Sequence, residues 1–424
     1  MSPAATETWP RRVLAGIDSG DTDAYAAHLD TWGPLPGASG PAIVEAVEAS
    51  GLLGRGGAGF PAGRKMRTVA AAANRRPVVV ANGAEGEPAS GKDALLLGRT
   101  PHLVLDGIQL AARAVGADEA HLALHRGSPV AGAVRAAMAR RGGPDGVPVR
   151  LHEIPSRYVA SEESALIHYL NNGEAKPTFT PPRPFEQGVG RRPTLVNNVE
   201  TLAHVAAIAR RGAAWFREVG DADEPGTLLV SISADGVTRR VAEVPTGTTI
   251  GAVADRAGVG RDGVAAVLVG GYFGSWLPAA YAWQLPLTHR AMRSAGAALG
   301  AGVVAVLPSS SCGVAETARV LGYLAAHNAG QCGPCLNGLP AIADALRRLA
   351  SGAWDERWWP ALERWMAVVP GRGACRHPDG AIRFASTALS VFAEDVAAHR
   401  SGRPCRAWSA DPWLPVPRPP GGWR

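Results

Sequence analysis

The fold of this chain is decided by Gly51-Leu-Leu-Gly-Arg-Gly-Gly-Ala-Gly-Phe-Pro-Ala-Gly-Arg-Lys65. The stretch gathers five glycines around Arg55, namely Gly54, Gly56, Gly57, Gly59 and Gly63. Because glycine lacks a Cβ, its backbone N–H can approach a ligand closely, and N–H groups that lead into a helix attract anions. Met66 follows Lys65 where a Walker loop has Ser or Thr, so no hydroxyl for Mg²⁺ is supplied. The loop predicts a flavin or nicotinamide phosphate site, or else a tight turn in a glycine-rich chain.

The residues around this loop alternate between helical and strand patterns. Helical spacing of apolar residues precedes the loop, and short β-branched or apolar runs alternate with further helical segments after it. The expected helices are 41–50, 103–115 and 129–141, and the expected strands are 76–82, 120–125 and 147–154. This order predicts an α/β unit with a mostly parallel sheet and helices on its faces.

An acidic turn, Asn82-Gly-Ala-Glu-Gly-Glu87, directly follows the first expected strand. Ligands of open α/β sheets bind at the carboxyl ends of strands, so Asn82, Glu85, Gly86 and Glu87 are well placed for one. The alternative is a charged surface loop.

Two further polar clusters each precede a helical pattern. In Arg157-Tyr158-Val-Ala-Ser161-Glu162-Glu163, Ser161 is expected to cap a helix, and capping with the helix dipole would alone explain both glutamates. In Asn197-Asn198-Val-Glu-Thr201, paired amides offer the donors and acceptors that a heterocycle or ribityl chain needs. The alternative for the asparagines is helix capping.

Composition narrows the function class. The 424 residues suffice for two to four domains, and 43 Lys plus Arg against 37 Asp plus Glu give a net charge of +6. No basic block interleaved with aromatic residues is present, so a nucleic-acid partner is not expected. The N-terminus lacks a signal-peptide pattern, and the longest apolar stretch, 295–307, is too short for a bilayer. We therefore expect a cytoplasmic protein without direct membrane insertion.

The cysteine pattern points to metal chemistry. Five cysteines and no expected signal peptide argue against a disulfide framework. Helical patterns over 314–327, 339–351, 361–368 and 382–398 enclose Cys332-Gly-Pro-Cys335 and the later Cys375. A Cys-x-x-Cys pair with a distant Cys suits an iron–sulfur cluster held by helices, while buried structural thiols are the alternative.

Four stretches together resemble the NADH- and FMN-binding subunit of respiratory complex I, a subunit type shared with NAD-reducing hydrogenases and formate dehydrogenases. They are Gly54-Arg-Gly-Gly-Ala-Gly-Phe-Pro, Asn82-x-x-Glu-Gly-Glu-Pro, Glu162-Glu163 and Pro193-Thr-x-x-Asn-Asn-Val-Glu-Thr-Leu. Their order and the later cysteines extend the resemblance from about residue 40 to about residue 395.

The resemblance implies a flavoprotein that takes hydride from NAD(P)H to FMN and passes electrons to an iron–sulfur cluster. It places the FMN phosphate near Asn197 and Asn198, and places Lys65, Asn82 and Glu85 along the flavin. Phe60 and Glu87 would lie near the nicotinamide, with Glu87 the one candidate catalytic side chain, and Glu163 near the ribose. The other implied cofactor-binding residues are Gly54, Arg55, Gly56, Gly57, Gly86, Tyr158, Glu162 and Thr201.

The implied architecture has three parts. A Rossmann-like flavin domain with a parallel sheet would span 43–222, a ubiquitin-like β-grasp domain without chemistry of its own 224–305, and a helical iron–sulfur domain 306–400. Residues 1–42 would be an extension, and 401–424 a Pro/Arg-rich tail that we expect to be disordered. A hairpin is expected around Asp235-Gly236.

The chain also departs from the pattern of the family. Ala84, Thr68, Thr180 and Arg183 stand where the resemblance expects an Asp, an aromatic, a Lys and an aromatic, so NAD(H) use stays open.

Ala329 replaces the first of four cluster cysteines, which leaves Cys332, Cys335 and Cys375. The fourth ligand could be His327, water, Cys312 or Cys405. The cluster is then 4Fe-4S, 3Fe-4S or absent.

Three functions follow from these observations. The leading one is an FMN-dependent oxidoreductase subunit that works with a ferredoxin or another iron–sulfur subunit, in or beside a membrane reductase complex. The second is a flavin and iron–sulfur relay that receives electrons from a ferredoxin-like protein without NADH. The third is a non-catalytic scaffold.

Overall fold

The computed structural model describes residues 9–17, 25–72, 75–141, 146–233, 239–403, 405, 407–409, 411–417 and 421–424. Helix α1 (Tyr25–Trp32) precedes the first sheet, whose four strands pair in parallel in the order β3-β2-β1-β4. The strands are β1 (Val78–Asn82), β2 (Glu119–His125), β3 (Val149–Ile154) and β4 (Thr194–Asn198). The predicted parallel α/β unit is therefore confirmed.

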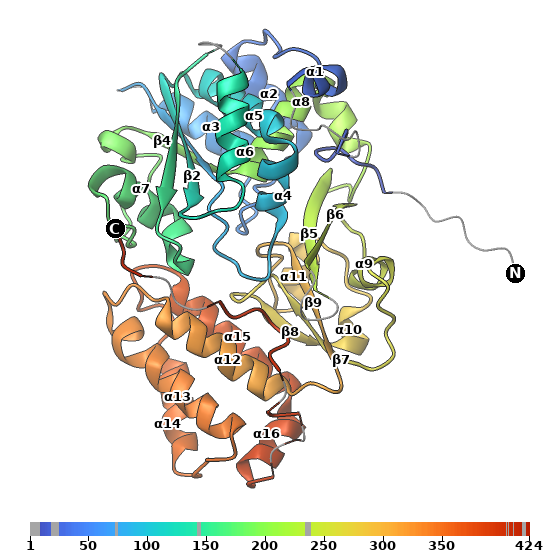
Figure 1. The fold of residues 1–424 in the computed structure, drawn as a ribbon, viewed down its shortest axis with the longest axis vertical. Coiled ribbons are helices and arrows are strands. Elements are labelled where there is room, and N and C mark those ends of the chain that lie inside the picture. The colour runs from blue at the N-terminus through green and yellow to red at the C-terminus, as the bar shows by residue number, and fades with distance from the viewer. Residues whose placement is uncertain are drawn as a thin grey trace, which may run out of the picture.

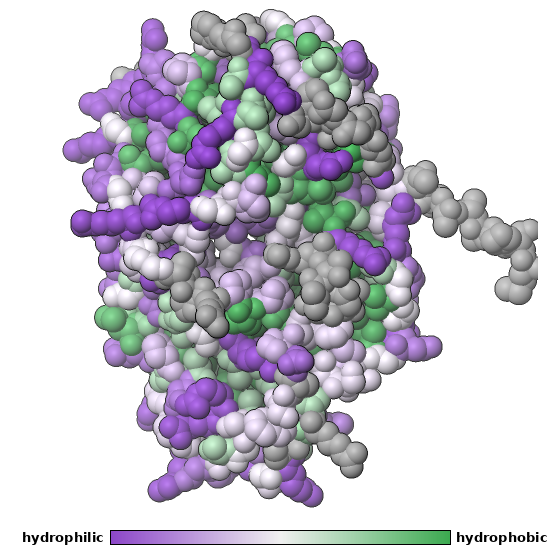
Figure 2. Space-filling model, in the orientation of Figure 1, coloured by the Kyte–Doolittle hydropathy of each residue, from purple (hydrophilic) through white to green (hydrophobic). Residues whose placement is uncertain are grey.

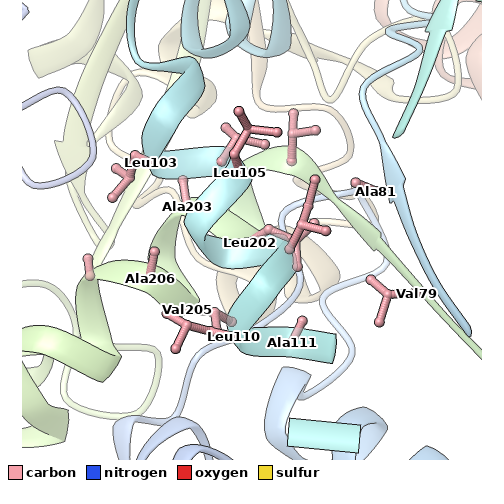
Figure 3. Packing of buried hydrophobic residues seen from close by; sticks show 14 of the residues in the cluster. Val79, Ala81, Leu103, Leu105, Leu110, Ala111, Leu202, Ala203, Val205 and Ala206 are labelled. Carbon is pink, nitrogen blue, oxygen red and sulfur yellow. The ribbon is translucent and has the colours of Figure 1, made fainter. Parts of the chain in front are cut away.

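Helices cover this sheet, as Figure 1 shows. They are α2 (Gly40–Ser50), α3 (Ala62–Ala71), α4 (Lys92–Arg99), α5 (Pro101–Val115), α6 (Ala131–Arg140), α7 (Glu163–Asn172) and α8 (Val199–Arg217). Helices α5 and α8 approach closely at Gly107, where a Cβ would lie 2.0 Å from the Leu202 carbonyl oxygen. Figure 3 shows the apolar side chains that α5, α8 and β1 contribute to one buried cluster.

The second sheet has five strands in the order β6-β5-β9-β7-β8. They are β5 (Thr227–Ser233), β6 (Arg239–Pro245), β7 (Val264–Val269), β8 (Ser275–Pro278) and β9 (Val303–Pro308), with α9 (Ile250–Arg256), α10 (Ala279–Ala282) and α11 (His289–Ser294) alongside. Strands β5 and β6 form the expected antiparallel hairpin, whose turn at Asp235-Gly236 lies outside the described residues. Strand β9 runs across the domain boundary expected at residue 305.

The remaining elements are helical. They are α12 (Gly313–Ala326), a π-helical turn (Pro334–Gly338), α13 (Leu339–Ala350), α14 (Trp358–Val368), α15 (His377–Val391) and α16 (Ala393–Arg400). The single helix predicted over 382–398 is wrong, because the chain breaks at Phe392 (φ −103°, ψ 33°) and α15 begins at His377. The Phe392 ring packs against Trp276 with 5.3 Å between ring centroids, which explains the break as a packing effect.

The tail predicted to be disordered is anchored to the rest of the chain at several points, although most of its described residues are exposed. Leu414 is fully buried, Trp413 Nε1 donates to the Val306 carbonyl at 2.8 Å, and Ala175 N donates to the Trp423 carbonyl at 2.9 Å. Figure 1 shows the chain end beside α7, across the molecule from α16. Aromatic and apolar side chains among the prolines provide the buried surface that the composition argument overlooked.

The outer surface is mixed. On the face shown in Figure 2, hydrophobic side chains form small separate patches between hydrophilic ones. Every helix in the described part of the chain is too short or too polar to cross a bilayer.

Candidate functional site

The carboxyl ends of β1 and β4 bring three sequence motifs together. The two strands pair so that Asn82 lies directly opposite Asn198. The glycine-rich loop reaches the same edge, where Arg55 N donates to Thr201 Oγ1 at 2.8 Å. Gly57 has φ +114°, a backbone conformation that residues with a side chain rarely adopt. It faces Gly300 of the second sheet domain.

These motifs surround a cavity of about 720 Å³. All sixteen residues that the resemblance implied for cofactor binding line it: Gly54, Arg55, Gly56, Gly57, Phe60, Lys65, Asn82, Glu85, Gly86, Glu87, Tyr158, Glu162, Glu163, Asn197, Asn198 and Thr201. Segments more than a hundred residues apart in the sequence therefore share one wall.

The cationic side of the cavity begins with Lys65, in the first turn of α3. Its Nζ donates to Glu163 Oε1 at 2.8 Å and to the Val196 carbonyl at 2.7 Å. The pair is partly exposed, so the ammonium is positioned beside the cavity and not sealed into the core.

Lys92 is a second cavity cation, and the sequence analysis missed it. Its side chain is buried, and Nζ contacts Asp93 Oδ1 at 2.8 Å, Glu200 Oε2 at 2.9 Å and Asn198 Oδ1 at 3.1 Å. Burial lowers the pKa of Lys92, but Asp93 and Glu200 outweigh it and raise the pKa overall. The adjacent Lys-Asp pair just after the acidic turn is the sequence signal that would have revealed this residue.

The acidic turn holds two buried carboxyl groups with different partners. Glu85 accepts from the Asp93 and Ala94 N–H groups, both at 3.3 Å, at the start of α4. Burial and the nearby Asp93 raise the pKa of Glu85 to about 7. Glu87 accepts from Tyr272 N at 2.7 Å and from Tyr158 Oη at 3.0 Å. Burial raises the pKa of Glu87 to about 7 as well.

Helix capping takes up some of the predicted ligand groups. Glu162, and not Ser161 as predicted, caps α7, because its carboxylate accepts from Ser164 N at 3.0 Å and Ala165 N at 3.1 Å. Ser161 instead ends a short 3₁₀ turn, Tyr158–Ser161. Among these residues the capping interpretation therefore holds for Glu162, while Glu163 pairs with Lys65.

The two asparagines behave differently. Asn198 caps α8, accepting from Glu200 N at 3.0 Å, and its Nδ2 donates to Asp93 Oδ2 at 2.7 Å. Asn197 is buried in the cavity wall, and its Nδ2 has no hydrogen-bond partner among the described residues. A buried amide donor without a partner favours a ligand acceptor at this point of the cavity.

The side chains of two predicted residues are bonded to other parts of the protein and are not available to a ligand. The guanidinium of Arg55 donates to the Thr227 carbonyl at 2.8 Å, so it ties the glycine-rich loop to β5. The Asn82 amide is occupied by the Ser161 carbonyl at 2.8 Å and by Ala84 N at 3.2 Å. Their contribution to the cavity is its shape and its backbone.

The two later domains also supply cavity residues, which the sequence analysis did not foresee. The second sheet domain, which was expected to have no chemistry of its own, contributes Gly270, Phe273, Ala298, Gly300 and Ala301 to the cavity lining. Helix α15 and the turn before it add Cys375, Arg376, His377, Asp379, Gly380 and Arg383. Apart from Cys375, which was expected as a cluster ligand, no local motif marks these positions in the sequence.

The three predicted cluster cysteines lie near one another at the cavity side of the helical domain. Cys335 is buried, and burial with the neighbouring Cys332 and Cys375 thiols raises its pKa. The backbone N–H of Ala329 also faces the Cys335 thiol. Cys375 both belongs to this group and lines the cavity, so one residue joins the two sites.

The structure narrows the choice of a fourth cluster ligand. Cys312 precedes α12 and Cys405 lies beside it, whereas Cys332 follows the far end of this helix, which is about 21 Å long. Cys312 and Cys405 are therefore too distant. His327 Nδ1 accepts from Tyr158 N at 3.1 Å, so the proton is on Nε2, which then lacks the lone pair that a metal needs.

The departures from the family pattern lie mainly at the surface. Thr68, Thr180 and Arg183 are exposed, and none is among the described residues that line the cavity, whereas Ala84 is.

Comparisons with known proteins agree with this geometry. Residues 47–207 match the family model described as "Nuo51 FMN-binding domain", and residues 315–399 match "NADH-ubiquinone oxidoreductase-F iron-sulfur binding region". The first range contains the glycine-rich loop, the acidic turn and both asparagines. The second contains all three cluster cysteines.

Whole-chain relatives extend the match. The chain is 33% identical to the NADH-quinone oxidoreductase F 2 subunit of Rhizobium meliloti over 379 residues, covering 86% of this chain and 90% of the relative. It is 32% identical to the NADH-quinone oxidoreductase F subunit of Escherichia coli over 383 residues, covering 86% and 85%. A solved NAD⁺-reducing [NiFe]-hydrogenase in the H₂-reduced state matches at a TM-score of 0.82 and 31% identity, covering 92% of this chain and 67% of that one. The chain belongs to the family of NADH-quinone oxidoreductase F subunits.

Proposed function

We propose that this chain is an electron-transfer flavoprotein subunit that oxidises a reduced nicotinamide nucleotide at FMN and delivers the electrons to an iron–sulfur cluster. One observation carries the proposal: the cavity lined by every expected cofactor residue also includes Cys375 of the thiol group. A nucleotide and flavin cavity next to thiol ligands is the arrangement that this reaction requires.

The chemistry of the cavity wall fits FMN. Asn197 offers a buried N–H donor that no described residue accepts from, the glycine-rich loop brings backbone close to the cavity, and Lys65 supplies positive charge for a phosphate. Bound FMN would supply hydride acceptance and single-electron release. Phe60, 49% exposed at the cavity, is free to stack on an entering nicotinamide or adenine ring.

The thiol group consists of cysteines, which are the usual ligands of an iron–sulfur cluster. Cys332, Cys335 and Cys375 supply three thiolates once the metal has displaced their protons. The sequence has Ala329 at the fourth position, and the geometry around α12 excludes His327 as it stands, as well as Cys312 and Cys405. Water or a ligand from outside this chain would complete the set.

The working assembly is part of the same proposal. The relatives are subunits of quinone-reducing and hydrogen-oxidising enzymes by their names. We therefore expect the acceptor to be another iron–sulfur protein or a ferredoxin, in a cytoplasmic complex on or near a membrane reductase.

The experiment is an anaerobic titration of the flavin-replete protein with NADH, followed through the visible absorbance of the flavin. Stoichiometric bleaching supports the proposal. Bleaching by dithionite but by neither NADH nor NADPH would refute nucleotide oxidation and favour the relay fed by a protein donor. Failure of the protein to retain flavin after reconstitution would leave only the scaffold.

A further inference from the structure

A second group of metal-binding side chains lies apart from the cavity, at the start of α12. It consists of Cys312 before α12, His399 in α16 and Cys405 in the tail. The two sulfur atoms and one imidazole nitrogen all lie within 4.8 Å of one another. Cys312 and His399 are buried and Cys405 is partly exposed. Three separate elements thus bring their ligand atoms to one point.

The ring of His399 is oriented as a metal ligand requires. Its Nδ1 lies 3.1 Å from the Leu349 carbonyl oxygen, which only accepts hydrogen bonds, so Nδ1 carries the proton. The lone pair is therefore on Nε2, which faces Cys312 Sγ at 3.4 Å and, without a metal, accepts from Cys405 N at 3.5 Å. Ligating histidines in proteins are generally fixed by such a second hydrogen bond.

Cys312 occupies a position that supports a thiolate. It is the N-cap of α12, and its Sγ accepts from Ala315 N at 3.3 Å. The partial positive charge of a helix N-terminus favours a thiolate there. Without a metal, burial raises the pKa of Cys312 to about 12, so the thiol stays neutral and donates to His399 Nε2.

The spacing matches a tetrahedral zinc site. Zn–S and Zn–N bonds of about 2.3 Å and 2.05 Å place neighbouring ligand atoms about 3.6 Å apart. The Cys312–His399 distance of 3.4 Å is close to that edge. The described residues offer no fourth Cys, His, Asp or Glu atom within the same spacing, and the partial exposure of Cys405 leaves room for water.

We propose that Cys312, His399 and Cys405 bind one Zn²⁺, with water in the fourth position. Binding replaces the two thiol protons with two Zn–S bonds, releases both protons to solvent and changes no oxidation state. The site is separate from the cluster thiols, because α12 lies between the two groups. Its effect is to fix the start of the tail, whose Trp413 and Leu414 then pack on β9 and α12.

The test counts zinc and iron in the purified full-length protein, after dialysis against micromolar zinc and then metal-free buffer. We expect one zinc per chain in addition to cluster iron. Cys405→Ser should weaken zinc binding by at least about tenfold and leave iron unchanged. Cys332→Ser should do the reverse, losing iron and keeping zinc. Because Cys405 is partly exposed, its serine variant is suited to the test even where Cys312→Ser fails to fold.

Two further readouts separate zinc from other states of these thiols. Cobalt substituted for zinc should give a sulfur-to-cobalt charge-transfer band that Cys405→Ser removes. Alkylation of Cys405 should require a chelator. A Cys312–Cys405 disulfide found by mass spectrometry, the absence of retained zinc, or zinc retained in Cys405→Ser but lost in Cys332→Ser would each overturn the proposal.

Discussion

The flavin cavity and the cluster thiols differ in how far each is complete without its cofactor. In the cavity, the buried Lys92 ammonium has carboxylate partners in Asp93 and Glu200, and Glu162 and Asn198 cap helices. In the thiol group, burial raises the pKa of Cys335 and raises that of Cys375 to about 11, so these two thiols are neutral until metal arrives. The cavity is preorganised by the chain, whereas the thiol group depends on its ligand.

This difference indicates where the sequence tolerates change. A partner missing from the cavity network would leave a buried charge uncompensated, which is costly. A ligand missing from the thiol group, as at Ala329, costs the folded chain little, because Cys335 and Cys375 stay neutral thiols. The expected cavity charges Lys65, Glu85, Glu87 and Glu163 are all present, although Ala84 replaces an expected Asp, whereas the cluster lacks one of its four cysteines.

The largest expected effect is that of Lys92→Met, which tests the claim that the cavity is balanced without cofactor. Methionine leaves Asp93 and Glu200 buried without their cation, so the unfolding free energy should fall by about 3–5 kcal/mol. The control is Lys176→Met, since Lys176 pairs with Glu174 near the surface and its loss should cost less than about 1 kcal/mol. Denaturant unfolding of the flavin-free protein measures the unfolding free energy of both variants. Equal losses would contradict the view that the cavity charges are balanced without cofactor.

Glu87→Gln should change the pH dependence of stability. Burial raises the pKa of Glu87 to about 7, above that of an unfolded glutamate, so the folded state binds more protons between about 4.5 and 7. The stability of the wild type should therefore fall, relative to the glutamine variant, as the pH rises through this window, by on the order of 3 kcal/mol.

Unfolding midpoints in urea at several pH values measure this difference. Glutamine also disturbs the hydrogen bonds of Glu87, but that penalty is constant with pH. Glu45→Gln, at an exposed position on α2, is the control for the substitution itself. A parallel pH profile for wild type and Glu87→Gln would show that the carboxyl group is ionised throughout.

Ala329→Cys should supply the missing fourth thiol of the group. The cluster site would then be as complete in its side chains as the cavity is. The Ala329 backbone faces Cys335, so a cysteine there can reach the same metal centre. We expect loss of iron in air to slow by at least about tenfold, or about 1.4 kcal/mol in barrier. Ala326→Cys adds an exposed thiol at the end of α12 and should not slow the loss.

Phe60→Ala should have the smallest effect, because Phe60 is exposed and belongs to neither buried network. Losing a ring that stacks on the nucleotide should raise the KM for NADH by about two- to tenfold, or about 0.5–1.5 kcal/mol, with kcat little changed. Phe179→Ala is the matched control, since Phe179 is 75% exposed and lies outside the cavity lining. Steady-state kinetics with a soluble acceptor would separate the two variants.

The sequence predicted the parallel sheet, the hairpin and most helices because local periodicity determines them. The acidic turn could be placed at the site because it follows a strand, at the sheet edge where ligands bind, whereas most other cavity residues were assigned through the family resemblance. What failed depended on tertiary contacts. Phe392 packs against Trp276 where a predicted helix breaks, and Leu414 is a buried anchor in a tail whose composition suggested disorder.

Residues contributed from a distance were also invisible. Phe273 and His377 reach the cavity from other domains without any local pattern. Lys92 stood beside a recognised motif, but only the fold shows that Glu200 and Asn198 converge on its ammonium. Glu162 and not Ser161 caps α7 because the helix begins one residue later than expected. Hydrophobic periodicity does not locate a helix start to within one residue.

The cavity wall is assembled from the parallel-sheet domain, the mixed-sheet domain and the helical domain. A ligand that fills it contacts all three, so its binding free energy is added to the unfolding free energy of each. Calorimetry should therefore show separate or broadened heat-absorption peaks for the empty chain and one sharper peak for the loaded chain. Cooperativity of melting is thus a property that the occupant, and not only the polypeptide, confers on this molecule.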